Sequence, residues 1–253
     1  DGVKNLSPRR RLKLVYDLAN LKNWRVAPLR RTYIPKPGRT EKRGLGIPVM
    51  ADRALQALVK QVLEPEWEAL FEPNVYGFRP GRSTHDAIEA IFNAICNLAK
   101  YVLDADIEKC FDRIDHEALM EKLKTIPSVA RLIQGWLKAG ILDKGKMLFP
   151  RAGTPQGGVI SPLLANIALH GFEQALKGMG DRDCTIIVIR YADDFVVLCR
   201  DLGTLVAAKE KAETWLANVG LRLKESKTHV THSLYKHEGR TGFDFLGFHV
   251  QQH

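Results

Sequence analysis

The sequence predicts an α+β fold in which amphipathic helices pack against short antiparallel strands. Segments with apolar residues three and four positions apart alternate with brief β-branched and aromatic runs that are bounded by turn residues. Of the 253 residues, 45% are hydrophobic and 26% are charged, which is ordinary for a globular protein and sufficient for a sizeable core. One large domain or two smaller lobes would both fit this length.

The first hundred residues predict three helices and a hairpin. Each helical segment carries an apolar stripe, and the hairpin has prolines, glycines and several basic residues near its tip. Pro65 is expected to end the second helix, because proline lacks the N–H that continues the helical ladder. In chain order we expect a helix over 8–19, a hairpin over 29–48, a helix over 52–63, a rigid arginine-containing loop over 76–82 and a helix capped by Ser83 or Thr84.

The remainder of the chain predicts a second group of strands and helices. Two apolar runs on either side of a short acidic turn indicate a hairpin with Asp193 and Asp194 at its tip. The expected elements are a strand over 101–106, a helix capped by Asp115, a glycine-rich loop over 153–158, a helix from Ser161 to about Leu176, strands over 185–191 and 195–199, a helix over 205–217 and a strand pair within 243–248.

The charge of the chain favours a polyanionic partner. Lys and Arg number 38 against 29 Asp and Glu, a net charge of +9, so the surface field should attract nucleic acid. A basic amphipathic segment can also be merely solvated or touch anionic lipid, but the interspersed Trp24 and Tyr33 fit a phosphate backbone better. The N-terminal positive charge lies at Arg9, Arg10, Arg11, Lys13, Lys22, Arg25, Arg30, Arg31, Lys36, Arg39, Lys42 and Arg43.

Other classes of protein are disfavoured by what the sequence lacks. No apolar run is long enough to cross a bilayer, and the start of the chain has neither a Met nor a secretory signal, so we expect the middle of a longer, cytoplasmic protein. No C-x-x-C pair occurs, so we expect buried free thiols in a reducing compartment at Cys96, Cys110, Cys184 and Cys199. Solvated or backbone-bonded side chains are expected at His229, His232 and His237.

Three carboxylates indicate metal-dependent chemistry. Asp193 and Asp194 stand together in an otherwise apolar hairpin, where neighbouring carboxylates repel each other. A divalent cation would remove that penalty, and two such ions ~4 Å apart can stabilise both the attacking and the leaving oxygen of phosphoryl transfer. Asp106, at the end of another strand, could supply a third acid. Taken alone, however, the Tyr-Ala-Asp-Asp turn is equally compatible with a solvated hairpin.

The acids stand among other motifs, given by their residue ranges at the end of this paragraph, that follow one another along the chain in a specific order. With them, the chain resembles the reverse transcriptases encoded by bacterial group II introns, over essentially all of its length. The resemblance implies the fingers and palm of a right-hand polymerase, with an antiparallel palm sheet, and implies RNA-templated DNA synthesis from dNTPs on a DNA primer. The matching segments are 35–37, 45–48, 76–83, 104–111, 154–166 and 191–194.

The resemblance assigns the acids to metal binding. It makes Asp106 and Asp193 the chief ligands of two Mg²⁺ ions, for which Mn²⁺ could substitute, with Asp194 beside them and the Ile107 carbonyl as a main-chain ligand. Their expected work is electrostatic, because phosphoryl transfer asks mainly for positioning and charge neutralisation. Asp104 is a weaker candidate, since it shares the strand face with Asp106 but lies farther from the strand's end. Asp112 is weaker on the same grounds.

Nucleotide-binding residues are implied in the same way. A bulky Phe111 under the incoming sugar could exclude a 2′-hydroxyl, although the alternative is an aromatic core residue. Arg and Lys chemistry suits phosphate binding by Arg43 and Lys36, with Arg39 and Lys42 as rivals in a loop that has two extra charged residues relative to the tightest family spacing. The residues implied to bind nucleotide are Lys36, Arg43, Phe111, Gln156 and Lys227, and those implied to bind template and primer are Arg79, Arg82, Gly157 and Tyr191.

The resemblance also divides the chain and leaves alternatives. It implies mainly fingers over 1–100 and mainly palm over 101–253, with 130–175 as a bridging loop and helix region and no thumb, so we expect a fragment that is weak or inactive alone. Intron RNA is a further expected partner, because relatives assist splicing and intron mobility. The alternatives are a non-catalytic maturase fragment that binds intron RNA and an RNA-dependent RNA polymerase, which would more usually carry Gly-Asp-Asp. Oligomeric state is left open.

Overall fold

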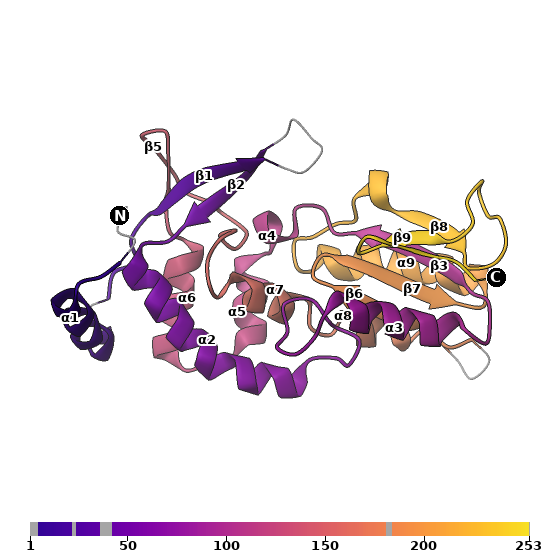
Figure 1. Ribbon diagram of the computed structural model, residues 1–253, viewed down its shortest axis with the longest axis horizontal. Helices are drawn as coiled ribbons and strands as arrows, with labels where there is room; N and C mark the ends of the chain where they lie inside the picture. The colour runs from indigo at the N-terminus through magenta and orange to yellow at the C-terminus, as the bar shows by residue number, and fades with distance from the viewer. Residues whose placement is uncertain (1–4, 22–23, 36–41, 181–183, 253) are drawn as a thin grey trace. The chain divides into compact units, whose positions relative to one another are not determined.

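The computed structural model describes residues 5–21, 24–35, 42–180 and 184–252 (Figure 1). These residues form two compact units, one from Asp1–Trp67 and Phe111–Ile167 and the other from Glu68–Cys110 and Ala168–His253. The division therefore differs from the expected boundary at residue 100. Residues 68–100 belong to the second unit because their helix packs on its strands, and the glycine-rich loop belongs to the first because it bonds to a strand there.

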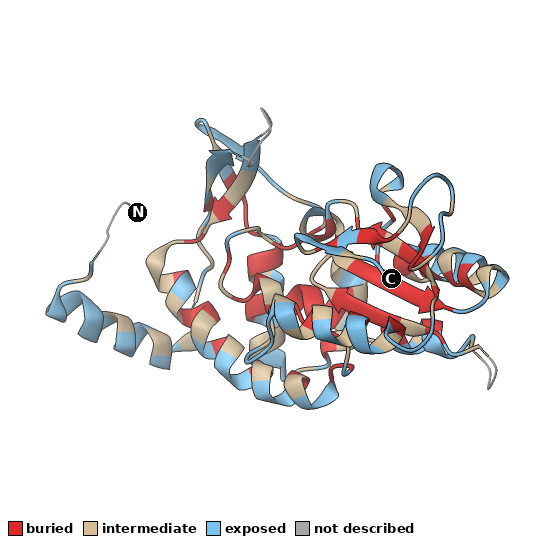
Figure 2. Ribbon diagram, turned by 45° about the vertical axis from the view of Figure 1, so that its right-hand side comes forward, coloured by how far each residue is buried: buried red, intermediate tan, exposed pale blue. Residues whose placement is uncertain are grey.

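The first unit begins with an open, basic helix. Helix α1 (Pro8–Ala19) starts as predicted, with the Ser7 side chain accepting the Arg10 N–H and proline in the first turn. None of its residues is buried, and its apolar stripe of Leu12, Val15 and Tyr16 is exposed (Figure 2). Both its charge and its apolar stripe are thus open to solvent.

The hairpin that follows belongs to a four-stranded sheet. Strands β1 (Leu29–Pro35) and β2 (Lys42–Ile47) pair antiparallel as predicted, and residues 36–41 between them lie outside the described residues. The sheet order is β2-β1-β4-β5, in which β4 (Ile141–Asp143) runs parallel to β1 and β5 (Lys146–Leu148) runs antiparallel to β4. The sequence did not predict β4 and β5, because three residues are too few to show a strand period.

Helix α2 (Met50–Leu70) is longer than predicted, and the expectation that Pro65 ends it is wrong. A proline inside a helix costs ~3 kcal/mol through a lost hydrogen bond and a steric clash. Leu63 and Trp67, which flank Pro65, are both buried, and burying two such side chains offsets a cost of that size.

A buried acid joins α2 to the rest of the first unit. The carboxylate of Asp52, which is 2% exposed, accepts hydrogen bonds from the indole N–H of Trp24 at 2.9 Å and from the backbone N–H of Ala27 at 3.0 Å. The indole N–H of Trp136 lies 3.4 Å from the same carboxylate. Trp24 was expected along a phosphate backbone, but its indole N–H is used inside the unit.

Two helices begin at or next to residues predicted as caps. Asp115 accepts the Ala118 N–H at 2.8 Å as the cap of α5, and Ser161, also expected as a cap, is the first residue of α7. The helix expected to continue to about Leu176 instead breaks at Gly171, whose φ of 90° is in the left-handed region, and resumes as α8. The bounds are α4 (Cys110–Arg113), α5 (His116–Leu123), α6 (Pro127–Leu137) and α7 (Ser161–Leu169), followed in the second unit by α8 (Phe172–Lys177).

The second unit is built on an antiparallel sheet with strand order β6-β7-β3-β8. The acidic hairpin supplies β6 and β7, and the strand that ends in Asp106 pairs with β7 and β8. A separate strand pair, β9 and β10, follows. The bounds are β3 (Tyr101–Asp106), β6 (Ile187–Tyr191), β7 (Asp194–Cys199), β8 (His229–His232), β9 (Phe243–Phe245) and β10 (Phe248–Val250).

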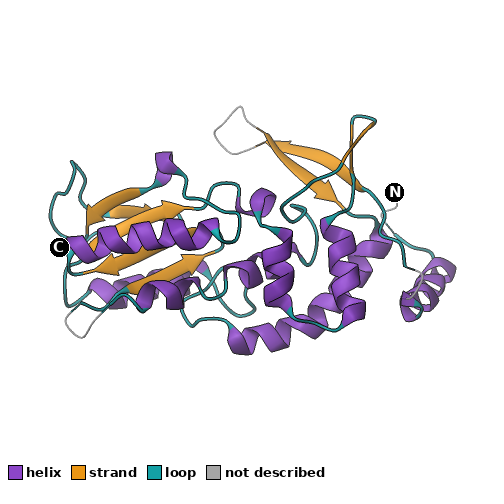
Figure 3. Cartoon of the chain, turned by 180° about the vertical axis from the view of Figure 1, so that it is seen from behind, coloured by secondary structure: helices purple, strands orange, loops and turns teal. Residues whose placement is uncertain are grey.

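Helices cover both faces of this sheet. Helix α3 (Thr84–Ile95), which begins at a capping box between Ser83 and Asp86, packs with β9 against one face through Val102, Ile189, Val196 and Leu198. Helix α9 (Leu202–Ala217) crosses the other face (Figure 3). There the Phe172 ring lies 5.0 Å from that of Phe195 and 5.3 Å from that of Trp215. The strand core is consequently fully buried (Figure 2).

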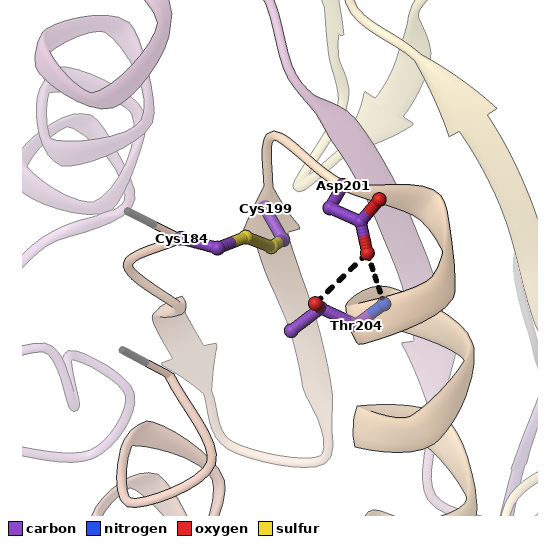
Figure 4. Close-up of a disulfide and its surroundings, with 4 residues drawn as sticks. All are labelled: Cys184, Cys199, Asp201 and Thr204. Carbon is purple, nitrogen blue, oxygen red and sulfur yellow. Dashed lines mark hydrogen bonds between the residues drawn. A yellow bond between two sulfur atoms is a disulfide. The ribbon is translucent and has the colours of Figure 1, made fainter. Parts of the chain in front are cut away.

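The cysteines depart from the expectation of free thiols. Cys184, just before β6, and Cys199, at the end of β7, form a disulfide at the base of the hairpin, with their Cα atoms 6.5 Å apart (Figure 4). Cys110 is a buried thiol outside the disulfide, as expected, whereas the Cys96 thiol is exposed. Sequence spacing could not reveal the pair, because antiparallel strand pairing brings the two positions together. The disulfide thus ties the hairpin at the end opposite its acidic turn.

Within the described ranges, we find no helix whose length and hydropathy would let it cross a bilayer.

Candidate active site

The three predicted acids come together at one end of the second unit's sheet. Asp106 ends β3 and Asp194 begins β7, and the two are cross-strand partners. Partners in an antiparallel pair project their side chains from the same face of the sheet. Asp104, two residues before Asp106, shares that face. Asp194, expected at the hairpin tip, is thus the first strand residue after the turn.

Asp193 lies in a two-residue turn that is bonded to the end of β3. Tyr191 pairs with Asp194, which leaves Ala192 and Asp193 as the turn. Ala192 has a φ of 58°, and two-residue hairpins that need a positive φ at this position usually place glycine there. The Asp193 carbonyl accepts the backbone N–H of Ile107 at 2.9 Å. This hydrogen bond ties the turn to the residue after Asp106.

Crowding of carboxylates perturbs their protonation. Burial, followed by repulsion from Asp193 and Asp106, raises the pKa of Asp194 from 3.8 to about 6. Burial, followed by repulsion from Asp194 and Asp244, likewise raises the pKa of Asp104 to about 6. The face therefore holds more negative charge than its half-buried position favours without a cation.

Lys227 supplies a positive charge at these acids. It ends the short helix η2 (Glu225–Lys227), and its Nζ forms an ion pair with the Asp106 carboxylate. The Lys224 N–H donates to the Asp106 carbonyl at 2.9 Å, which fixes this helix to the strand end. Burial acts to lower the pKa of Lys227, but its hydrogen bond to Asp106 and the attraction of that carboxylate and of Asp194 leave the pKa raised. Lys227 thus stays protonated beside the acids.

The donor set fits Mg²⁺ completed by a substrate. No group of three or more His, Cys, Asp and Glu side chains in the described part of the chain is arranged to hold a metal ion by itself. Mg²⁺ commonly uses one or two carboxylates and takes its other oxygens from water and phosphate. Asp106 and Asp194 face each other as cross-strand partners, and the raised pKa of Asp194 reflects repulsion that a cation would relieve.

A second set of predicted residues comes together in the first unit. Half-buried Phe111 in α4 accepts the Thr154 N–H through its carbonyl at 2.5 Å, so the glycine-rich loop packs on the helix that carries this ring. The Gln156 carbonyl accepts the Gly46 N–H of β2 at 2.7 Å. Loop, aromatic ring and basic hairpin are therefore joined in one unit. Phe111 is not fully buried, and Asp112 beside it is exposed.

Two of these positions require glycine. Gly153 has a φ of 88°, and a Cβ there would lie 2.5 Å from the Phe111 carbonyl oxygen. Gly157 has a φ of 111° and faces Gly46 of β2. The absence of side chains thus lets the loop approach both α4 and β2, as its glycines predict.

The basic residues divide into exposed and internal ones. Arg43 and Lys42 at the start of β2 are exposed, and Lys36 and Arg39 lie outside the described residues. Arg82 is exposed, with its guanidinium 5.2 Å above the Tyr76 ring. The half-buried Tyr191 ends β6, beside the acids.

Arg79 corrects the expectation that it binds template. Only 6% of its side chain is exposed, and its guanidinium donates to the Glu68 carboxylate and to the carbonyls of Glu72 and Val75. It also lies 5.5 Å above the Phe71 ring. Its donors are used inside the second unit, so Arg79 shapes the loop that carries Arg82. Sequence could not distinguish the two arginines, because they occupy the same motif.

Sequence reasoning missed residues that support the turn from behind. Gly77 and Arg190 are buried beside the turn, and Glu72 is buried near Arg190. An arginine in an otherwise apolar strand was an available signal for Arg190, since a buried charge needs partners. Among the histidines, the Nδ1 of His232 accepts the backbone N–H groups of Leu234 and Tyr235, which is the backbone-bonded state expected.

The chain matches one family of proteins along most of its length. Residues 34–250 match the family described as reverse transcriptase (RNA-dependent DNA polymerase). Protein YkfC of Escherichia coli strain K12 is 33% identical, and the match covers 98% of this chain and 74% of YkfC. The group II intron-encoded protein LtrA of Lactococcus lactis subsp. cremoris is 41% identical over 62% of this chain, which is 27% of LtrA.

Solved structures share the fold. Apo telomerase from Candida tropicalis superposes with a TM-score of 0.69 at 17% identity, covering 89% of this chain and 53% of that one. Telomerase from Candida albicans, solved with a fragment of telomeric RNA, gives a TM-score of 0.70 at 14% identity and covers 95% of this chain and 47% of that one. The predicted α+β, right-hand polymerase architecture is thereby confirmed. The chain spans about half the length of these telomerases and about a quarter of LtrA.

Proposed function

The chain belongs to the reverse transcriptase (RNA-dependent DNA polymerase) family, and we propose that it is the fingers and palm of an active enzyme of group II intron type. The proposed reaction is transfer of a deoxynucleotide from a dNTP to the 3′-hydroxyl of a DNA primer on an RNA template. One observation carries the proposal: Asp106 and Asp194 are cross-strand partners, with Asp193 in the adjoining turn and Lys227 paired to Asp106.

The acids would act by holding metal ions. Asp106 and Asp193, with Asp194 beside them and the Ile107 carbonyl, are the proposed ligands of two Mg²⁺ ions, and Mn²⁺ is the proposed substitute. When bound, the ions neutralise charge on the attacking and leaving oxygens of the phosphoryl transfer. The hydrogen bond from the Ile107 N–H to the Asp193 carbonyl keeps the turn beside the strand end that carries Asp106.

Lys227 would neutralise charge on the leaving pyrophosphate. Its raised pKa keeps it an ammonium group at neutral pH, and its ion pair with Asp106 keeps it at the acids. A lysine presents a compact point charge on a flexible stem, which suits a phosphate that arrives and departs. Lys227 can therefore exchange the carboxylate for a phosphate oxygen without moving far.

The first unit would bind the incoming nucleotide and the template. Half-buried Phe111 is proposed to exclude a 2′-hydroxyl, and Gln156 and Gly157 are proposed to approach the nascent base pair on the loop that packs on α4. Arg43, with Lys36, is the proposed triphosphate contact. From the second unit, Arg82 and Tyr191 are proposed to contact template and primer. Arg79 has no such proposed role, because its guanidinium donates to groups inside the second unit.

A second candidate function is RNA binding for splicing. Helix α1 carries Arg9, Arg10, Arg11 and Lys13, and none of its residues is buried. Four cations on an open helix favour binding of a phosphate backbone. We therefore propose intron RNA as a further partner, with template copying and maturase work as activities of the whole protein. The purely non-catalytic alternative gives no reason for an intact set of three acids.

Single-nucleotide primer extension tests the proposal. Asp193→Asn should abolish Mg²⁺-dependent addition of dNTP to a DNA primer on an RNA template, while binding of the template–primer duplex is retained, because the substitution removes a metal ligand and leaves the basic surfaces intact. The matched control is Asp112→Asn, which removes an exposed acid one residue after Phe111. The assay uses the whole protein that contains this chain. Equal extension by Asp193→Asn and by its parent would contradict the metal assignment, and a whole protein that binds RNA tightly without extending a primer would favour the maturase alternative.

A further inference from the structure

A buried segment closes the outer edge of the sheet beside the catalytic turn. The backbone N–H of Arg190 in β6 donates to the Asn74 carbonyl, and the N–H of Tyr76 donates to the Arg190 carbonyl, both at 2.9 Å. Val75 thereby forms a parallel bridge with Arg190. Residues 74–76 thus act as a short added strand, and the segment continues directly toward the turn.

The next residue of this segment touches the turn backbone. A Cβ at Gly77 would lie 2.3 Å from the Ala192 nitrogen and 2.9 Å from the Tyr191 carbonyl carbon. Real Cβ atoms do not approach backbone that closely, so only glycine fits without displacing the turn. Ala192 itself has a φ of 58°, a conformation that is unfavourable for an L-residue and must be held by its surroundings.

Arg190 holds the same turn from within the strand. Arg190 is 2% exposed, and its Nη1 donates a hydrogen bond to the Ala192 carbonyl at 3.0 Å. Burial lowers the pKa of Arg190 to about 10, against the opposing attraction of Glu72 and Glu173. The guanidinium therefore remains charged at neutral pH and bonds a turn residue whose backbone is otherwise unfavourable.

The two carboxylates near Arg190 are themselves fixed. Glu72, 5% exposed, accepts the Gly171 N–H at 2.8 Å. Glu173, 3% exposed, accepts the backbone N–H of Asn74 at 3.3 Å and its side-chain amide at 2.9 Å. The charge balance of Arg190 thus comes from groups that cannot move without breaking hydrogen bonds in the added strand and at the start of α8.

We propose that Gly77 and Arg190 are positioning residues, which hold the Ala192–Asp193 turn so that the Asp193 carboxylate stays beside Asp106. This inference rests on the proposed catalytic role of that turn. Gly77 sets how closely the added strand supports the turn, and Arg190 fixes the Ala192 carbonyl. Neither Gly77 nor Arg190 is proposed to contact substrate or metal.

The test compares Gly77→Ala with Gly178→Ala in the full chain. Gly178 also lies in the second unit, has a φ of −64° and would place its Cβ no nearer than 3.5 Å to other atoms, so it reports the effect of a methyl group alone. Arg190→Lys is the second variant, because it keeps the charge facing Glu72 and Glu173 but loses the guanidinium fork. The measurements are single-nucleotide extension against Mg²⁺ and dNTP concentration, Mn²⁺ binding by electron paramagnetic resonance, thermal unfolding and exchange of the Ile107 amide hydrogen.

We expect Gly77→Ala to lower kcat on the order of 10- to 100-fold, because small misplacements of a catalytic group have effects of that size. The Mg²⁺ concentration for half-maximal rate should rise, Mn²⁺ should bind more weakly, and the Ile107 amide should exchange faster, since its acceptor is the Asp193 carbonyl. The KM for dNTP should change less than kcat. Arg190→Lys should shift the same quantities in the same direction.

Two results would overturn the inference. One is a Gly77→Ala protein whose Ile107 exchange and Mn²⁺ affinity match those of Gly178→Ala. The other is a lowered unfolding temperature with an unchanged Mg²⁺ midpoint, which indicates a merely structural role. If the parent itself neither extends a primer nor binds Mn²⁺, the proposed function fails, and the exchange of the Ile107 amide still decides whether Gly77 holds the turn.

Discussion

Replacing Asp194 with asparagine should stabilise the protein in the absence of divalent ions. The pKa of this carboxyl is raised to about 6 in the folded state, from 3.8, by burial and by Asp193 and Asp106. Below about pH 4 the carboxyl is protonated in both the folded and the unfolded state, so it does not lower the free energy of unfolding there. Between about pH 4 and pH 6 the carboxyl ionises in the unfolded state while it stays protonated in the folded state, so stability is lost as pH rises through this range and the loss is complete at neutral pH.

The size of the effect follows from the pKa. The difference between about 6 and 3.8 corresponds to at most ~3 kcal/mol, at 1.36 kcal/mol for each pKa unit. Because the side chain is only half-buried, solvent screening reduces the expected gain to ~1–2 kcal/mol at pH 7.5. Mg²⁺ should stabilise the parent more than Asp194→Asn, because a bound cation offsets the repulsion that the substitution has already removed.

Urea unfolding with EDTA at pH 4, 6 and 7.5, and again at pH 7.5 with Mg²⁺, measures both effects. Asp104→Asn is the matched control, since its carboxyl has a pKa raised to about 6 on the same sheet face but lies farther from the strand end. It should also stabilise the metal-free protein, while leaving the response to Mg²⁺ close to that of the parent. A metal-free Asp194→Asn protein that is no more stable than the parent at pH 7.5 would refute the electrostatic reasoning.

Two further substitutions test other parts of the chain. Phe111→Ala should ease incorporation of ribonucleotides relative to deoxyribonucleotides on one template, because it removes the proposed steric block to a 2′-hydroxyl; an unchanged ratio in a competition assay would make Phe111 a packing residue. Asp52→Leu should destabilise the protein by ~2–4 kcal/mol in denaturant unfolding, because it leaves the part-buried N–H groups of Trp24 and Ala27 without their acceptor; a loss below that of a typical surface substitution would contradict the role of this carboxylate.

Local patterns predicted most of the secondary structure. Caps and turns are chemical signals carried by one or two residues, so Ser83, Asp115 and Ser161 each marked a helix start. The errors arose where tertiary packing outweighs local preference. Pro65 lies within a helix because neighbouring apolar side chains are buried, and three-residue strands carry too little periodicity to be recognised.

That the acids meet at one end of a sheet was predictable, and the residues that hold the turn were not. Asp106 and the Tyr-Ala-Asp-Asp turn stand out because carboxylates close together at strand ends repel each other, a penalty that a cation would relieve. Arg79 and Arg82 occupy one motif, and only packing decides that Arg79 is internal. Gly77 lies in the matching segment 76–83, but no local pattern shows why glycine is required there, since the requirement comes from a turn more than a hundred positions away in the chain.

The geometry of the turn explains why a strained alanine can stand before Asp193. A positive φ at Ala192 costs ~1–2 kcal/mol, which a flexible turn would relieve by rearranging. Three contacts from separate segments oppose that rearrangement: the backbone at Gly77, the guanidinium of Arg190 and the N–H of Ile107. The disulfide anchors the other end of the hairpin. Because the opposing contacts come from different segments, the turn can hold closely spaced carboxylates at a fixed position without a cation, which is the preorganisation that the proposed metal-assisted phosphoryl transfer would require.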